Sequence, residues 1–125
     1  MMIKYLNIIT LYILIIYISC ASESFPGGKR VYTSNCESCH MEDGSGLPPM
    51  YPSLHNSTYL NSNLKELPCI ILNGKQSQLI KNIIMPAHDF NDVELTNLIN
   101  YMNVKWGTNQ NILLKDVQKN MKNCK

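Results

Sequence analysis

Apolar residues recur at helical spacing most clearly in the segment that follows Asn91. The apolar positions of this segment are Leu95, Leu98, Ile99, Met102 and Trp106. They fall on one face of a helix. Asn91 is a good N-cap with Glu94 at the capping-box position, and Gly107 is suited to end the helix. The pattern therefore predicts a helix over 92–106.

Shorter helices are predicted on both sides of this segment. They are expected over about 27–36, 57–60, part of 63–73 and 113–122. The helix within 63–73 stops at Gly74, and Pro68 either begins it or kinks it. No strand pattern and no internal repeat is predicted, so the expected fold class is all-α.

The last predicted helix carries Leu113, Val117 and Met121 on one apolar stripe. Between the helices, 41–56 and 75–90 are expected to be loops, the first because it is rich in proline and glycine. Loops of this length in so small a domain suggest that they wrap a ligand.

The N-terminal segment over residues 3–18 is mostly Ile, Leu and Tyr, broken by Lys4, Asn7 and Thr10. It is shorter than the roughly 20 apolar residues that span a membrane. Lys4 before the run and small residues at 19–22 predict a secretory signal that is removed, although an uncleaved anchor is the alternative. Ile18-Ser19-Cys20 resembles a bacterial lipobox, in which Cys20 is acylated. The alternative is ordinary cleavage after Ala21 or Ser22. We assign 1–19 to the signal and 20–26 to a tether.

Composition adds limits on size and partners. The chain has 125 residues, of which 45% are hydrophobic and 16% charged, with a net charge of +2. This allows one domain, and the absence of a polybasic block argues against nucleic acid as a partner. The five cysteines lie at positions 20, 36, 39, 69 and 124. Because five is odd, disulfides alone cannot use them all.

The candidate chemistry lies in Cys36-Glu37-Ser38-Cys39-His40, a C-x-x-C-H motif. Positions i and i+3 at a helix end face the same way, so both thiols can form thioethers with the vinyl groups of one haem. The adjacent histidine then supplies an axial ligand to the iron. A redox dithiol would need a βαβ context, and a zinc site would need a second ligand pair. The motif therefore predicts one covalently attached haem c.

The sixth position of the iron has several candidate ligands. Met85 stands in a loop before Pro86, where no helix face needs an apolar side chain, and it is the preferred candidate. His88 is the main rival and would give bis-histidine ligation. Met50 is possible, and an unligated sixth site is a further alternative.

At this point the sequence resembles the class I c-type cytochromes over about residues 27–106. The strings that carry the likeness are GKRVYTSNCESCH, YPSL, IIMPAHDF and LTNLINYM. The resemblance implies a cytochrome c fold, in which the N- and C-terminal helices cross beside the haem.

The same resemblance implies roles for single residues. Gly28 and Tyr32 would pack against Leu98 and Tyr101 where the two helices cross. The Pro52 carbonyl would accept the Nδ1 proton of His40, and the distal-methionine loop supports Met85. That makes 27–107 the haem domain and 108–125 an additional helical extension.

Cys69 and Cys124 remain after the haem motif and the signal are assigned. In an oxidising compartment they are expected to form a disulfide that closes a loop of about 55 residues and stabilises the fold by roughly 2–5 kcal/mol. The alternative is a buried free Cys69 and a reactive Cys124.

Charge divides the chain unevenly. From Lys105 onward, five lysines against one aspartate give +4, whereas 20–104 carries five Lys/Arg against eight Asp/Glu, which gives −3. The basic tail is either a solvated face or a docking surface for an acidic redox partner.

Together these features predict a monomeric one-electron carrier rather than an enzyme. Two fixed ligands, His40 and Met85, would leave no open position at the iron. The expected setting is a bacterial respiratory or redox chain, with partner redox proteins such as an oxidase or reductase. The chain would lie in the periplasm, anchored through lipidated Cys20. The alternative is a haem-based gas or peroxide sensor, or an enzyme, with a labile sixth ligand.

Overall fold

A computed structural model describes residues 5, 7–13, 23–77 and 80–124. Residues 5 and 7–13 are helical, and the rest of the predicted signal lies outside the described residues, as does Cys20 of the predicted tether. Within the described part of the chain, no helix is long and apolar enough to cross a membrane.

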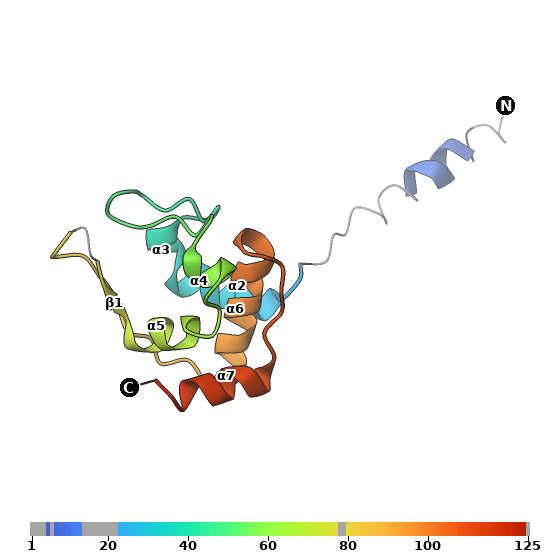
Figure 1. Cartoon of the computed structure of the whole chain (residues 1–125). Coiled ribbons are helices and arrows are strands. Elements are labelled where there is room, and N and C mark those ends of the chain that lie inside the picture. The colour runs from blue at the N-terminus through green and yellow to red at the C-terminus, as the bar shows by residue number, and fades with distance from the viewer. Residues whose placement is uncertain (1–4, 6, 14–22, 78–79, 125) are drawn as a thin grey trace.

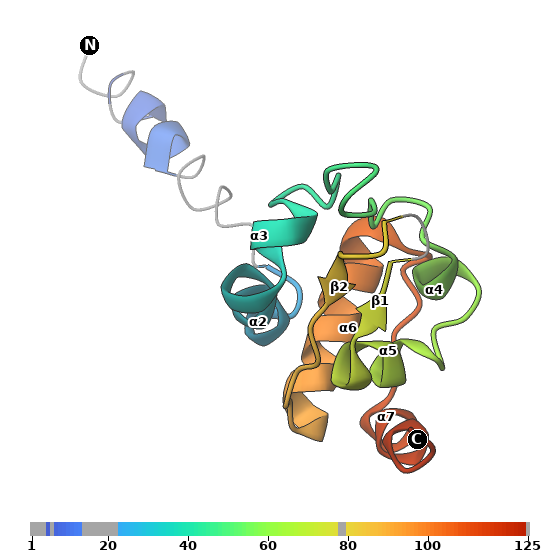
Figure 2. The same cartoon turned by 90° about the vertical axis from the view of Figure 1, so that its left-hand side faces the viewer.

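The haem-domain region and its extension are mostly helical (Figure 1), so the expected all-α class is confirmed. The elements are α2 (Pro26–Asn35), α3 (Glu37–His40), α4 (Thr58–Asn61), α5 (Leu67–Asn73), β1 (Lys75–Gln76), β2 (Ile84–Met85), α6 (Asp92–Trp106) and α7 (Leu114–Met121). The loop predicted over 41–56 joins α3 to α4. In both Figure 1 and Figure 2, α3 lies in the upper part of the domain and α7 at the bottom, with α5 above α7.

α6 is the longest described helix and the centre of the core. Its predicted capping box is present: the Asn91 side chain accepts from the backbone N–H of Glu94 at 2.9 Å, and the Glu94 carboxylate accepts from the Asn91 N–H at 3.1 Å. Leu95, Leu98 and Ile99 on its apolar face are completely buried. The strong periodicity and the cap therefore predicted this element correctly at both ends.

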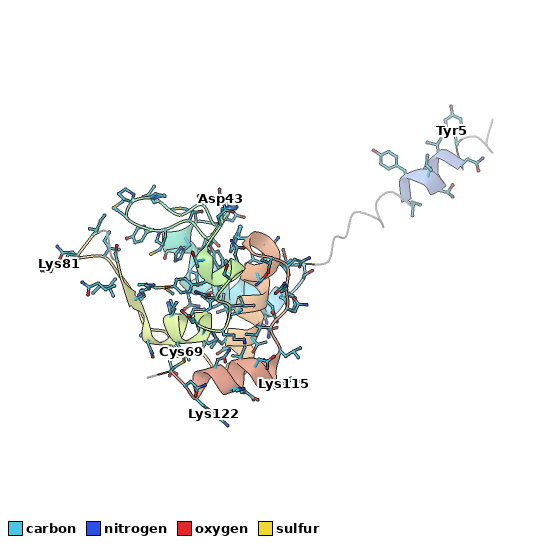
Figure 3. The ribbon with its side chains drawn as sticks, viewed as in Figure 1. Tyr5, Asp43, Cys69, Lys81, Lys115 and Lys122 are labelled. Carbon is cyan, nitrogen blue, oxygen red and sulfur yellow. A yellow bond between two sulfur atoms is a disulfide. The ribbon has the colours of Figure 1, made fainter. Side chains whose placement is uncertain are left out.

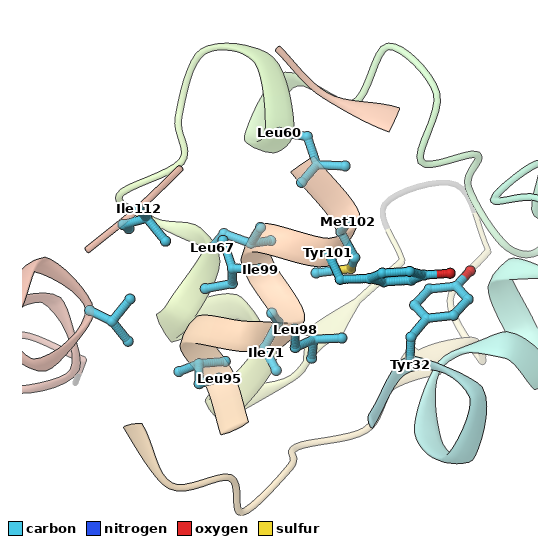
Figure 4. Close-up of a cluster of buried hydrophobic side chains, with 11 residues drawn as sticks. Tyr32, Leu60, Leu67, Ile71, Leu95, Leu98, Ile99, Tyr101, Met102 and Ile112 are labelled. Carbon is cyan, nitrogen blue, oxygen red and sulfur yellow. The ribbon is translucent and has the colours of Figure 1, made fainter. Parts of the chain in front are cut away.

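α2 crosses α6 at a glycine. A Cβ placed on Gly28 would lie 2.0 Å from the backbone carbonyl oxygen of Asn97, so the two backbones touch where a side chain cannot fit. Beside this contact the rings of Tyr32 and Tyr101 pack with centroids 5.7 Å apart, and Leu98 is buried in the same core (Figure 4). Gly28 and Tyr32 thus meet Tyr101 on α6.

Two expectations about local structure were wrong. A short antiparallel hairpin exists, in which Lys75 pairs with Met85 and Gln76 with Ile84. Its strands have two residues each, too few for a period-2 pattern to be visible in the sequence. The second concerns Leu113, which is 54% exposed because it is the N-cap of α7 and precedes the helical turns that face the core.

The choice left open at Pro68 is resolved, because α5 begins at Leu67 and Pro68 lies in its first turn. A proline tolerates this position, where its missing N–H has no helical partner to lose. Gly74 follows the helix as its C-cap with φ 72°.

The C-terminal extension packs against the haem domain. Val117 on α7 is fully buried. The side chain of Asn100 on α6 donates to the Ile112 carbonyl at 3.1 Å and accepts from the Ile112 N–H at 2.8 Å. Cys69 on α5 and Cys124 are joined by a disulfide (Figure 3).

Candidate functional site

The C-x-x-C-H motif begins where α2 ends. The Cys36 N–H donates to the Tyr32 carbonyl at 2.8 Å as the C-cap of α2. α3 then begins at Glu37, and the His40 N–H donates back to the Cys36 carbonyl at 2.9 Å. The motif therefore forms its own helical turn rather than the last turn of α2. Cys36 and Cys39 are half-buried and carry free thiols.

The loop after the motif holds the histidine ring. The Nδ1 atom of His40 lies 3.0 Å from the Pro52 carbonyl oxygen, an acceptor only, so Nδ1 carries the proton of the neutral ring. This leaves Nε2 as the ring nitrogen available to a metal, and the hydrogen bond to Pro52 fixes the orientation of the ring. Gly46 makes the approach possible, because a Cβ there would lie 2.6 Å from the Pro52 carbonyl oxygen.

The β1–β2 hairpin carries Met85 and is held by the end of α5. A Cβ on Gly74 would lie 2.5 Å from the Met85 carbonyl oxygen, and the positive φ of this residue also favours glycine. The His88 N–H donates to the Ile71 carbonyl at 3.2 Å. The segment from Met85 to His88 is thus fixed to α5 by backbone contacts.

These three segments enclose one cavity of about 410 Å³. Cys36, Cys39, His40 and Met85 all line it, as does Pro52. The chain therefore brings the predicted thioether and ligand residues together, although they come from segments far apart in the sequence.

The rival sixth ligands reach the same cavity. Met50 and His88 also line it. The His88 ring stacks on Phe90 at a centroid distance of 5.1 Å and an interplanar angle of 5°, and Met50 is 40% exposed. Met85 is half-buried in β2. The His88 ring is thus already stacked on another side chain and Met50 is exposed, whereas Met85 is half-buried at the cavity.

The chemistry of the cavity wall fits a haem. Apart from histidine, Lys75 is the one charged side chain among the described residues that line the cavity, and no carboxylate is among them. Its ammonium donates to the Tyr59 hydroxyl and lies 4.5 Å from the Tyr59 ring centroid. An apolar slot with one cation suits a macrocycle that is apolar except for its propionates. A second hollow of about 710 Å³ is lined largely by charged and polar side chains and includes neither cysteine.

The raised pKa of the Cys36 thiol in the cavity argues against a redox-active dithiol. Burial raises the pKa of the Cys36 thiol to about 12, and the neighbouring Cys39 adds to this shift. Reactive cysteines have a lowered pKa instead, because the thiolate is the nucleophile. Burial also lowers the pKa of His40, against the opposing effect of its Pro52 hydrogen bond. A neutral imidazole is the form that binds iron.

A zinc centre finds no support either. Among the described residues, no group of three or more His, Cys, Asp or Glu side chains is arranged to hold a metal ion.

Several supporting hydrogen bonds were not predicted from the sequence. The Tyr32 hydroxyl donates to the Met41 carbonyl at 2.6 Å and so fixes the chain directly after the motif. Asn103 is buried on α6, where its side chain accepts from the Gln110 N–H at 3.1 Å. The spacing of Asn100 and Asn103, one turn apart within an apolar helix, was the available signal, because asparagine is a poor helix former.

Comparison with known proteins identifies the family. Residues 23–102 match the family model described as "Cytochrome C oxidase, cbb3-type, subunit III". The chain is 29% identical over 101 residues to the "Alcohol dehydrogenase (quinone), cytochrome c subunit" of Gluconobacter oxydans (strain 621H), which covers 74% of this chain and 21% of that protein. It is 40% identical over 47 residues to "Cytochrome c-554(548)" of Halomonas halodenitrificans, which covers 36% of this chain and 54% of that protein.

A solved structure shares the fold. The c-type cytochrome XoxG from Methylobacterium extorquens AM1 superposes with a TM-score of 0.51 at 25% sequence identity, over 80% of this chain and 66% of XoxG. The chain thus spans about a fifth and about half of the two curated relatives. Since the family model covers more than half of its residues, this chain belongs to the c-type cytochromes, whose cofactor is covalently bound haem c.

Proposed function

We propose that the chain is a one-electron carrier whose haem is attached through Cys36 and Cys39 and ligated by His40 and Met85. The observation that carries this proposal is that one cavity gathers all four side chains. The bound haem supplies one-electron chemistry between ferric and ferrous iron.

The residues of the chain would set the conditions for that chemistry. Pro52 orients His40 through the 3.0 Å hydrogen bond, so the ligand does not need to turn when the iron changes charge. The thioether of Met85 is a soft ligand that favours ferrous iron and raises the potential relative to a second histidine. With both axial positions filled, no open site is left for a substrate, which favours a carrier over an enzyme.

The proposed setting is a bacterial redox chain outside the cytoplasm. Export through the N-terminal signal, with an acyl anchor on Cys20, would place the protein at a membrane face in the periplasm. One relative is named as the cytochrome c subunit of a quinone alcohol dehydrogenase, so a dehydrogenase or another redox enzyme is a fitting partner for a monomeric carrier. No feature of the sequence suggests nucleic acid.

A pyridine haemochrome spectrum tests the attachment. The full chain should be expressed with a haem-attachment system, and the wild type should carry one haem that organic solvent does not extract. Cys36→Ser and Cys39→Ser should each leave a spectrum with one unreacted vinyl group, and the double variant should lose covalent haem. Ser38→Ala, between the two cysteines, is the control and should keep both thioethers. A wild type without covalent haem would contradict the proposal.

A further inference from the structure

The C-terminal extension has no role in the haem site described above. It lies outside residues 23–102, which the family model matches. It is nevertheless firmly packed: Val117 is fully buried, and Asn100 holds both backbone groups of Ile112. A helix that is docked in this way constrains whatever it touches.

The extension touches α5 and is cross-linked to it. Cys124 is bonded to Cys69, 55 residues earlier in the chain. α7 lies under α5, on the side of the molecule away from α3 (Figures 1 and 2). The extension therefore contacts α5 from the end of the domain opposite α3.

α5 in turn holds the segment that carries Met85. Gly74, at its C-terminal end, approaches the Met85 carbonyl so closely that a Cβ would lie 2.5 Å away. The Ile71 carbonyl accepts from the His88 N–H at 3.2 Å. One short helix thus links the disulfide to both ends of the Met85–His88 segment.

α5 is poorly suited to keep its position unaided. It has seven residues, and its N-cap, Glu66, makes no side-chain capping hydrogen bond. Helices of this length are not stable alone and depend on tertiary contacts. Those contacts come from the burial of Leu67, Pro68 and Ile71, from packing against α6 and α7, and from the bond to Cys124.

We propose that residues 108–124, through the Cys69–Cys124 disulfide, position α5 and thereby keep Met85 at the iron. This inference rests on the proposed function, because it requires Met85 to be the sixth ligand. Cys69 and Cys124 are positioning residues here, since neither lines the cavity that gathers Cys36, Cys39, His40 and Met85. Loss of the cross-link frees the chain end and α5, and Met85 then leaves the iron more often.

Carbon monoxide measures this event, because it binds ferrous iron only when the sixth position is vacant. The holoprotein of the full chain, reduced with ascorbate, should be mixed with carbon monoxide for the wild type, Cys124→Ser and Cys69→Ser/Cys124→Ser. We expect both variants to bind at least tenfold faster than the wild type. The double variant excludes an effect of the free Cys69 thiol.

Leu60→Ala is the matched control. Leu60 is 1% exposed on α4, and neither α5, α7 nor the hairpin contains it. It should lower the midpoint of chemical unfolding while the rate of carbon monoxide binding stays within about twofold of the wild type. Val117→Ala loosens α7 while the disulfide stays intact, and it should also raise the rate of carbon monoxide binding. This variant tests the proposal if the serine variants do not accumulate.

Two outcomes would overturn the proposal in different ways. If the serine variants unfold more easily but bind carbon monoxide at the wild-type rate, the disulfide serves overall stability only. If the wild type itself binds carbon monoxide as fast as Met85→Ala, then Met85 is not the sixth ligand, and both this inference and the ligation in the proposed function fail.

Discussion

Gly28 shows how much one missing side chain contributes at the helix crossing. Its Cα faces the backbone of α6, and the space that a methyl group needs is occupied by the Asn97 carbonyl. At Gly27, one residue earlier, an added Cβ would make only ordinary van der Waals contact, since the nearest Asn97 side-chain atoms would lie 3.7 Å away. Substituting each glycine by alanine therefore distinguishes two effects: both substitutions change helix propensity, but only the one at Gly28 disturbs the close approach of the two backbones.

We expect Gly28→Ala to destabilise the protein by about 3 kcal/mol, because α2 and α6 must move apart to accept the methyl group. Gly27→Ala is the control and should change stability by less than about 1 kcal/mol. Guanidinium unfolding of both holoproteins, followed by circular dichroism, measures the difference. Equal midpoints for the two variants would contradict the close contact.

Lys75 is the single residue whose charge should affect the haem most directly. A cation that lines the cavity opposes the additional positive charge of ferric iron. Lys75→Gln should therefore lower the midpoint potential, by an amount on the order of tens of millivolts. Lys81→Gln is the control, since Lys81 is exposed and does not line the cavity. A redox titration in which the two variants change the potential equally would show that Lys75 does not face the haem.

At the scale of elements, α6 determines where its neighbours lie. It contacts α2 at the glycine crossing, and the side chain of Asn103 donates to the Leu60 carbonyl of α4 at 3.4 Å. Asn100 holds the segment that leads into α7. The buried side-chain amides of Asn100 and Asn103 on α6 thus hold both α4 and the C-terminal extension in place.

Asn100→Ala should cost about 2–4 kcal/mol, because it leaves the N–H and the carbonyl of Ile112 buried without partners. Asn111→Ala, at an exposed neighbouring position, should be close to neutral. Denaturant unfolding of both variants tests this difference. A loss of less than 1 kcal/mol for Asn100→Ala would mean that water replaces the amide.

The elements that the sequence predicted well are those with local causes. α6 has a capping box, an apolar stripe and a terminal glycine, and all three act within a few residues. The β1–β2 hairpin has no such signal, because its strands have only two residues each and Gly74 contacts the Met85 carbonyl across a separation of eleven residues. Leu113 was wrongly predicted to face the core, because the helical spacing of apolar residues does not show at which residue the helix begins.

At the scale of the whole molecule, the described helical domain forms one cavity from three segments that are distant in the sequence. The motif at 36–40, the loop at 49–52 and the hairpin residues at 75–77 and 83–86 meet only in the folded chain. The C-x-x-C-H motif predicted the first segment, and the family-like strings YPSL and IIMPAHDF cover Pro52 and Met85, but the strand Lys75–Gln76 was not predicted. The sequence did not show that Met50 and His88 share the cavity with Met85, since that depends on how the loops close.

Charge at this scale separates the basic tail from the cavity. Lys115 and Lys119 lie on α7, at the opposite end of the molecule from α3 in Figures 1 and 2. At physiological ionic strength exposed charges are screened beyond about 8 Å. Lys115→Gln/Lys119→Gln should therefore oxidise with ferricyanide at a rate within about twofold of the wild type. A tenfold slower stopped-flow rate would place the tail at the site of electron exchange.

The far-red absorption of the ferric protein tests the central claim most directly, because the weak sulfur-to-iron charge-transfer band requires a methionine ligand. The wild type and Met50→Ala should both show the band, and Met85→Ala should lack it. Absence of the band in the wild type, or its persistence in Met85→Ala, would contradict axial ligation by Met85 and the electron-carrier mechanism built on it.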